Sequence, residues 1–185
     1  MLKLVIGSLL AALALFFFGF IYWALSPMGH AAMKPTGNDA AVQAALRSVL
    51  TESGSYVVPG NEGTQEEMTA LHEAGPLAVI HYKAEGGPVM PPSAFVRGLL
   101  HSFTCALLLG FFMKLGLRSL PTYRCRLGFS VLLGATCALF WDAGAHIWWM
   151  HSGAWSASAA LYDVLAFTVL GSVMAALVKP AAAAD

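Results

Sequence analysis

The stretch LKLVIGSLLAALALFFFGFIYWAL, residues 2–25, contains a single charged side chain, Lys3. A helix of about 20 apolar residues crosses the hydrocarbon core of a bilayer, so this stretch is long enough to span it. The apolar run also exceeds the roughly 7–15 residues of a signal-peptide core. Pro27 directly follows the one small-residue cleavage site, at Ala24–Ser26. We therefore expect residues 1–27 to form an uncleaved transmembrane anchor.

The rest of the chain contains three more apolar stretches of membrane-spanning length. They are Phe95–Leu117, Leu127–Met150 and Trp155–Val178. The chain of 185 residues is 58% hydrophobic and 11% charged, with a mean hydropathy of +0.68. A typical soluble domain is about 25% charged. Because lipid offers the backbone no hydrogen-bond partner, each span must be helical. The sequence thus predicts an all-α membrane protein with four transmembrane helices in a bundle.

The distribution of charge predicts the orientation of these spans. Lys and Arg collect on the cytoplasmic side of membrane proteins. The chain ends carry Lys3 and Lys179, and the linker region between the second and third spans contains Lys114, Arg118, Arg124 and Arg126 and no acid. The segment between the first two spans is acidic instead, with Glu52, Glu62, Glu66, Glu67, Glu73 and Glu85. We expect both termini and the basic linker 118–126 to be cytoplasmic and residues 28–94 to be extracytoplasmic, before a three-helix region at 95–185.

Aromatic residues at the expected outer ends of the helices agree with this orientation, because Trp and Tyr prefer the membrane–water interface. They are Tyr22, Trp23, Trp148, Trp149 and Trp155.

The segment 28–94 has the pattern of a small α/β insert. Asn38 is a suitable N-cap for a helix at 39–50, and Thr64 with Glu67 forms a capping box for a second helix ending near Glu73. Two short β-type runs, at 55–58 and 77–83, follow these helices. The pattern leaves open whether the two strands pair parallel or antiparallel. An insert of about 65 residues is marginal as an independent fold, so we expect it to rest on the outer helix ends.

Small residues recur at every fourth position in two of the spans. Such ridges let helices approach closely in a membrane, where packing drives association. We expect these ridges to face each other or a neighbouring helix. Their members are Gly98, Ser102, Ala106 and Gly110 in the second span, and Ser130, Gly134 and Ala138 in the third.

Ionisable residues inside the spans are the one feature that suggests a site, because they are costly within a bilayer. At 1.5 Å per residue they fall at a similar depth near the outer surface, so we expect them to form one polar cluster within the bundle. They are Arg97, His101, Asp142, His146 and Asp163.

Several interpretations of this cluster remain open. It is either a structural polar lock, a proton or ligand site, or a quinone or lipid site. Metal binding by His101, Asp142, His146 and Asp163 is a further alternative, as is haem ligated by His101 and His146. No cofactor is the leading expectation.

The sequence contains no catalytic motif of the nucleophile-elbow, zinc-protease or phosphate-loop type. A net charge of zero and the absence of a nucleic-acid motif exclude nucleic acid as an expected partner. The cysteines, Cys105, Cys125 and Cys137, all lie outside residues 28–94, so we expect no disulfide within the insert.

Four motifs carry a resemblance to a known family. They are LVIGSLLAALALFFFG at 4–19, NDAAVQAAL at 38–46, GSYVVPG at 54–60 and GPLAVIHY at 75–82. Together they resemble an uncharacterised family of bacterial inner-membrane proteins with one anchor helix, a short periplasmic insert and three further spans. The chain departs from that pattern between Trp141 and Trp155. The resemblance implies a bacterial inner membrane and a periplasmic insert, and it implies no activity.

Three functions follow as hypotheses. The first is a non-enzymatic accessory or scaffolding subunit of a larger inner-membrane assembly, bound to other membrane subunits or to copies of itself. The second is a metal- or haem-binding redox protein that uses His101 and His146. The third is a proton-coupled small transporter that uses Asp142 and Asp163.

Overall fold

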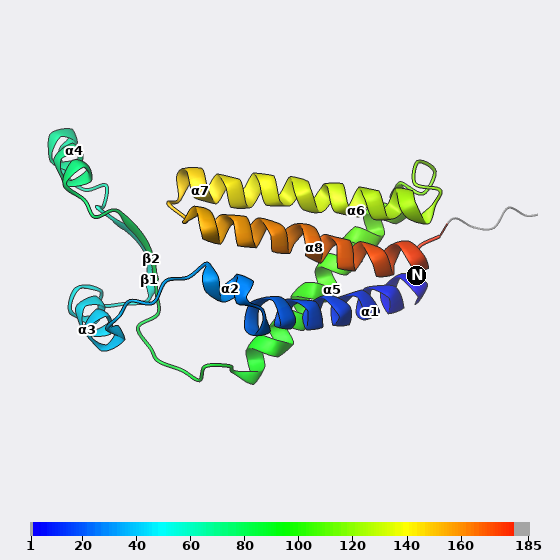
Figure 1. Cartoon of the computed structure of the whole chain (residues 1–185), viewed down its shortest axis with the longest axis horizontal. Coiled ribbons are helices and arrows are strands. Elements are labelled where there is room, and N and C mark those ends of the chain that lie inside the picture. The colour runs from blue at the N-terminus through cyan, green and yellow to red at the C-terminus, as the bar shows by residue number, and fades with distance from the viewer. Residues whose placement is uncertain (1, 180–185) are drawn as a thin grey trace, which may run out of the picture. The chain divides into compact units, whose positions relative to one another are not determined.

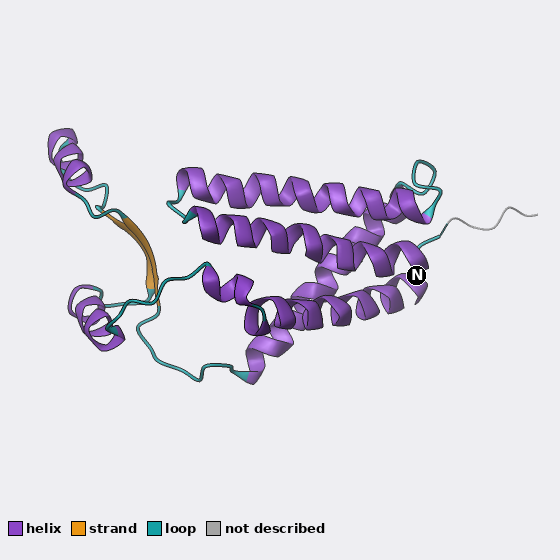
Figure 2. Ribbon diagram, in the orientation of Figure 1, coloured by secondary structure: helices purple, strands orange, loops and turns teal. Residues whose placement is uncertain are grey.

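The computed structural model describes residues 2–179 and is mainly helical (Figures 1 and 2). The chain divides into two compact units. Residues 34–89 with 148–150 form one, and the remaining residues of the described range 2–179 form the other. The elements, in order, are α1 Leu2–Phe20, η1 Ile21–Leu25, α2 Pro27–Ala31, α3 Asp39–Val49, β1 Gly54–Val58, α4 Gln65–Ala74, β2 Ala78–Tyr82, α5 Pro92–Leu115, α6 Tyr123–Ala138, η2 Leu139–Ala143, α7 Gly144–Trp148 and α8 Gly153–Leu177.

The prediction of four helices long and apolar enough to cross a membrane is confirmed. They are Leu2–Leu25, Pro92–Leu115, Tyr123–Trp148 and Gly153–Leu177. The first and third each contain a π-helical turn, η1 and η2, which the hydrophobic pattern did not indicate. A short helix, α2, also follows the first span without having been predicted.

Local capping moves the helix starts away from their predicted positions. Pro92 opens α5, since proline suits the first turn of a helix. The Thr122 side chain accepts a hydrogen bond from the Cys125 amide at 3.2 Å, so α6 begins at Tyr123. The predicted linker 118–126 therefore extends past the start of α6, because Arg124 and Arg126 already belong to that helix. Ser152 caps α8 in the same way.

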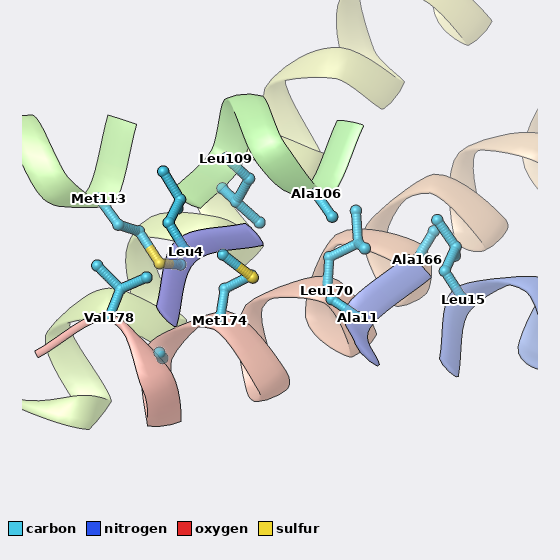
Figure 3. Close-up of a cluster of buried hydrophobic side chains, with 11 residues drawn as sticks. Leu4, Ala11, Leu15, Ala106, Leu109, Met113, Ala166, Leu170, Met174 and Val178 are labelled. Carbon is cyan, nitrogen blue, oxygen red and sulfur yellow. The ribbon is translucent and has the colours of Figure 1, made fainter. Parts of the chain in front are cut away.

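The buried apolar core lies between α1, α5 and α8 (Figure 3). Leu4 and Leu15 from α1, Leu109 and Met113 from α5, and Leu170 from α8 belong to it. Leu109 and Leu170 are almost completely buried. α8 packs against α1 on this side and against α6 on another, whereas α6 makes its main interhelical contact with α8.

The contact between α6 and α8 is made by small residues. The Ser130 hydroxyl donates a 2.6 Å hydrogen bond to the Phe167 carbonyl of α8. A Cβ placed on Gly134 would lie 2.6 Å from Phe167 Cβ, and one on Gly171 would lie 2.5 Å from Ser130 Cβ. The two backbones are therefore too close for larger side chains.

The small residues of the second span face different neighbours. Ser102, Ala106 and Gly110 are buried, and a Cβ on Gly110 would meet Leu4 of α1 and Met174 of α8. Gly98 lies beside Phe16 of α1. The ridge of the second span thus faces α1 and α8, and the ridge of the third span faces α8. The two ridges do not face each other.

Arg126 joins α6 to both the preceding loop and α8. Its side chain is buried, and its guanidinium donates to the carbonyls of Ala175, Leu120 and Pro121 at 3.1, 2.9 and 2.9 Å. Because these carbonyl oxygens accept hydrogen bonds from the guanidinium, a buried arginine is tolerated here. Lys3, Lys114 and Lys179 belong to helix ends of this same region, since Leu4, Met113 and Val178 share one core.

The unit formed by residues 34–89 is built on a two-stranded ribbon. β1 pairs antiparallel with β2, from Gly54 opposite Tyr82 to Val58 opposite Ala78, which answers the question that the sequence left open. α4 lies in the connection between the strands. The Thr64 hydroxyl and the Thr64 backbone amide both donate to the Glu67 carboxylate, which lowers the pKa of Glu67 below its ordinary value.

This unit has no core of its own. None of residues 34–89 is buried, and neither α3 nor α4 contains a buried residue. Polar links hold the open end of the ribbon, where the Ser53 hydroxyl donates to Glu85 at 3.0 Å and accepts from the Ala84 amide at 2.9 Å.

We expect Gly134→Val to lower the free energy of unfolding by about 2–3 kcal/mol, because the added side chain would enter the space of Phe167. Gly128→Val is the matched control in the same helix, since a Cβ on Gly128 meets nothing within 4 Å. Thermal unfolding of the two variants in detergent measures the difference. Equal stability of the two would contradict the close α6–α8 contact.

Candidate functional site

Two acids of the membrane-length helices, Asp142 and Asp163, lie on the half of the α6–α8 pair away from Arg126. Asp142 lies in η2, which packs against α8, the helix that contains Asp163. Asp142 is only 6% exposed, and its Oδ2 atom has no hydrogen-bond partner among residues 2–179. A buried carboxylate oxygen without a partner is costly, so this position requires an explanation beyond packing.

Two histidines follow Asp142 in the chain: His146 lies in α7, and His151 lies in the turn before α8. The His146 Nδ1 atom lies 2.7 Å from the His151 carbonyl oxygen. Because a carbonyl only accepts, Nδ1–H is the donor, and Nε2 of a neutral His146 ring is left as an acceptor. His151 is not among the residues that the sequence predicted for the polar cluster.

Arg97 and His101 make their contacts elsewhere. The Arg97 guanidinium bonds with the carbonyl and hydroxyl of Ser93, one turn earlier in α5. His101 is exposed, with its Nε2 atom 3.6 Å from the Cys105 sulfur of the same helix. The five residues expected in one cluster are therefore divided: Asp142, His146 and Asp163 lie on the α6–α8 side, and Arg97 and His101 on α5. The α5 helix packs against α1 and α8, which explains the separation.

Within residues 2–179, no three His, Cys, Asp or Glu side chains converge in a way that could hold a metal ion. His101 and His146 lie on different helices, α5 and α7.

Aromatic side chains join α1 to α8 near the same end. The Tyr22 hydroxyl donates to the Ser158 carbonyl at 2.8 Å. The ring of Trp23 lies 5.4 Å from that of Trp155 and 5.2 Å from that of Tyr162, which stacks on Phe18 at 5.7 Å. Three of the predicted interfacial residues thus also form a packed cluster. Trp148 and Trp149 remain exposed.

The spacing of two aromatic residues in the first span is a sequence signal for this cluster. Phe18 and Tyr22 are four residues apart and so lie on one face of a helix, and their rings are 6.0 Å apart. Nothing in the sequence identified Tyr162 as their partner on α8.

The unit of residues 34–89 offers a different kind of surface. The apolar face of α3 includes Val42 and Val49, which are both exposed, with Val49 at 71%. Between α3 and the end of β2 lies a shallow hollow of about 160 Å³, lined by Leu46, Arg47 and Tyr82 among others. Exposed apolar side chains beside a charged rim are typical of protein-binding surfaces.

Comparison of the chain with family models, with curated proteins and with solved structures found no match.

Proposed function

We propose that this chain is a non-enzymatic membrane protein that serves as an accessory or scaffolding subunit of a larger assembly in a bacterial inner membrane. In this proposal its four long helices form a bundle in the membrane, and residues 34–89 bind the partner. The observation that carries the proposal is that this folded unit buries none of its residues.

A unit without a core is poorly stabilised by itself. Ordering a residue costs roughly 1–2 kcal/mol of backbone entropy, which burial of apolar surface normally offsets. An isolated two-stranded ribbon is marginally stable at best in water. A partner that covers the exposed apolar side chains would supply the missing burial.

The charge of the unit indicates what that partner is. Residues 34–89 contain seven acidic and three basic side chains. An anionic lipid surface would repel such a segment, because membrane-surface binding relies on Lys and Arg. The composition favours a protein with an apolar groove and a basic rim.

The proposed orientation places both termini in the cytoplasm and residues 28–94 in the periplasm. It is supported by the position of Lys3, Lys114 and Lys179 at helix ends that share one region of the core. Arg126 lies in that region as well, bonded to the Ala175 carbonyl. Basic residues gathered at one end of a helical unit favour that end as the cytoplasmic one.

A second function, a proton-permeation unit using Asp142 and Asp163, is favoured by one observation. Asp142 is buried in η2, and η2 packs against α8, the helix that contains Asp163. Two like charges in a poorly solvated place repel each other, so a shared proton would relieve the repulsion.

Labelling with a membrane-impermeant maleimide tests the orientation. In a Cys125→Ser background, Glu62→Cys should react in intact cells, whereas Ser119→Cys should react only after the inner membrane is permeabilised. Both positions are exposed, so accessibility of the side chain is matched. Labelling of the Ser119→Cys variant from outside would reverse the orientation.

The docking proposal predicts that the protein in mild detergent has a native mass above the 19.5 kDa of one chain. Val49→Asp should weaken the complex at least about tenfold, since it places a charge in the apolar contact. Ser48→Asp, at the neighbouring exposed position, adds the same charge outside the apolar face and should leave the complex intact. A wild-type protein that is only ever monomeric rules out the subunit role.

The proton-permeation alternative is tested in liposomes that contain a pH-sensitive dye. A potential applied across the membrane should acidify the lumen with wild-type protein, and Asp142→Asn or Asp163→Asn should abolish the signal. Asp39→Asn in α3 is the control, because Asp39 lies outside the spans. Failure of the Asp142 and Asp163 variants to fold would instead assign the pair a structural role.

A further inference from the structure

A pocket of about 330 Å³ lies at the outer end of the α6–α8 pair. One wall consists of Leu139, Ala143 and His146, and the other of Ser156, Ala157 and Ala160. Apart from His146 and Ser156, these side chains are apolar and mostly small. The volume is at the lower end of the range for small-molecule sites, about 300–1,000 Å³.

Ser156 gives this pocket an unsatisfied polar group. The residue is 7% exposed, and its hydroxyl has no hydrogen-bond partner among the described residues. Ser8 and Ser172, also in membrane-length helices, donate to the carbonyls of Leu4 and Thr168. Leaving a buried hydroxyl unpaired costs about 1–3 kcal/mol. Ser156 is also one of the residues that line the pocket.

His146 supplies a second polar atom. Its Nδ1–H is already used by the His151 carbonyl, which leaves Nε2 of the neutral ring as an acceptor. Asp142, whose Oδ2 atom is also buried and unpartnered, belongs to the η2 turn that forms part of the same wall. π-helical turns of this kind are frequent at functional sites.

These groups define the ligand by its chemistry. The apolar walls and the position in a membrane-length helix pair favour a molecule that dissolves in the bilayer. A hydroxyl can accept from Ser156 and donate to His146 at the same time. We propose that this pocket binds a lipid-soluble molecule with a ring-sized apolar body and one hydroxyl, which is either a phenol or quinol ring or the hydroxyl end of a neutral lipid.

The proposal does not depend on the docking role of residues 34–89. The two can fail separately, because they concern different units of the chain and different binding assays.

The test uses the full chain in phosphatidylcholine nanodiscs, with 4-hexylphenol and hexylbenzene as probes and empty nanodiscs as the blank. Wild-type protein should bind 4-hexylphenol about 5–10-fold more tightly, because hexylbenzene leaves the Ser156 hydroxyl unpaired. Ser156→Ala should bring this ratio close to one, while Ser172→Ala should preserve it. Calorimetric titration measures both affinities.

Ala160→Leu fills the pocket and should abolish binding of both probes, whereas Ala154→Leu, at an exposed position outside the pocket on the same helix, should not. Should Ser156→Ala fail to fold, His146→Ala removes the second polar group and should reduce the ratio independently. Equal affinity of wild-type protein for the two probes, or full binding to Ala160→Leu, overturns the proposal.

Competition distinguishes the two sources of the hydroxyl. Displacement of 4-hexylphenol by decylubiquinol assigns a quinol-type ring, and displacement by dioleoylglycerol assigns a lipid hydroxyl. Displacement by neither, at concentrations that saturate the nanodisc, overturns both assignments.

Discussion

The approach of α8 to its neighbours is the interaction on which the rest of the membrane unit depends. Between two helices in lipid the hydrophobic effect contributes little, so association requires close packing and interhelical hydrogen bonds. α8 meets both requirements against α6, through Gly134 and the Ser130–Phe167 bond. On its other side it joins α1 and α5 through larger side chains such as Leu170 and Met174. The α8 helix thus makes a contact of small residues with α6 and a contact of larger apolar side chains with α1 and α5.

The two ends of the α6–α8 pair handle buried polar groups in opposite ways. At one end, the guanidinium of Arg126 is satisfied by three carbonyl oxygens. At the other, Asp142 and Ser156 each retain a buried oxygen without a partner. An unsatisfied pair costs stability in a protein that is only marginally stable as a whole. The proposed ligand site lies at the end where these two groups are unpaired.

The unit of residues 34–89 shows a related deficit in apolar burial. Its helices are well capped, and its strands pair in register over five residues each. Local structure is therefore satisfied, while the apolar side chains of α3 remain uncovered. Hydrogen bonds and caps hold the local elements, but only burial makes a unit of this size stable. The proposed docking role would account for a segment that has capped helices and paired strands but no buried residue.

The sequence by itself determined the four membrane-length helices, the capping boxes and the short strands, because each depends on residues close together in the chain. Length and hydropathy are sufficient for the spans, and Thr64 with Glu67 is sufficient for the start of α4. The tertiary structure alone decided that the strands pair antiparallel, that the small-residue ridges do not face each other, and that Arg97 and His101 make their contacts within α5. Periodicity tells which residues share a face of one helix, but it carries no information on which other helix that face meets. That choice is made by the packing of side chains distant in sequence, such as Gly134 against Phe167.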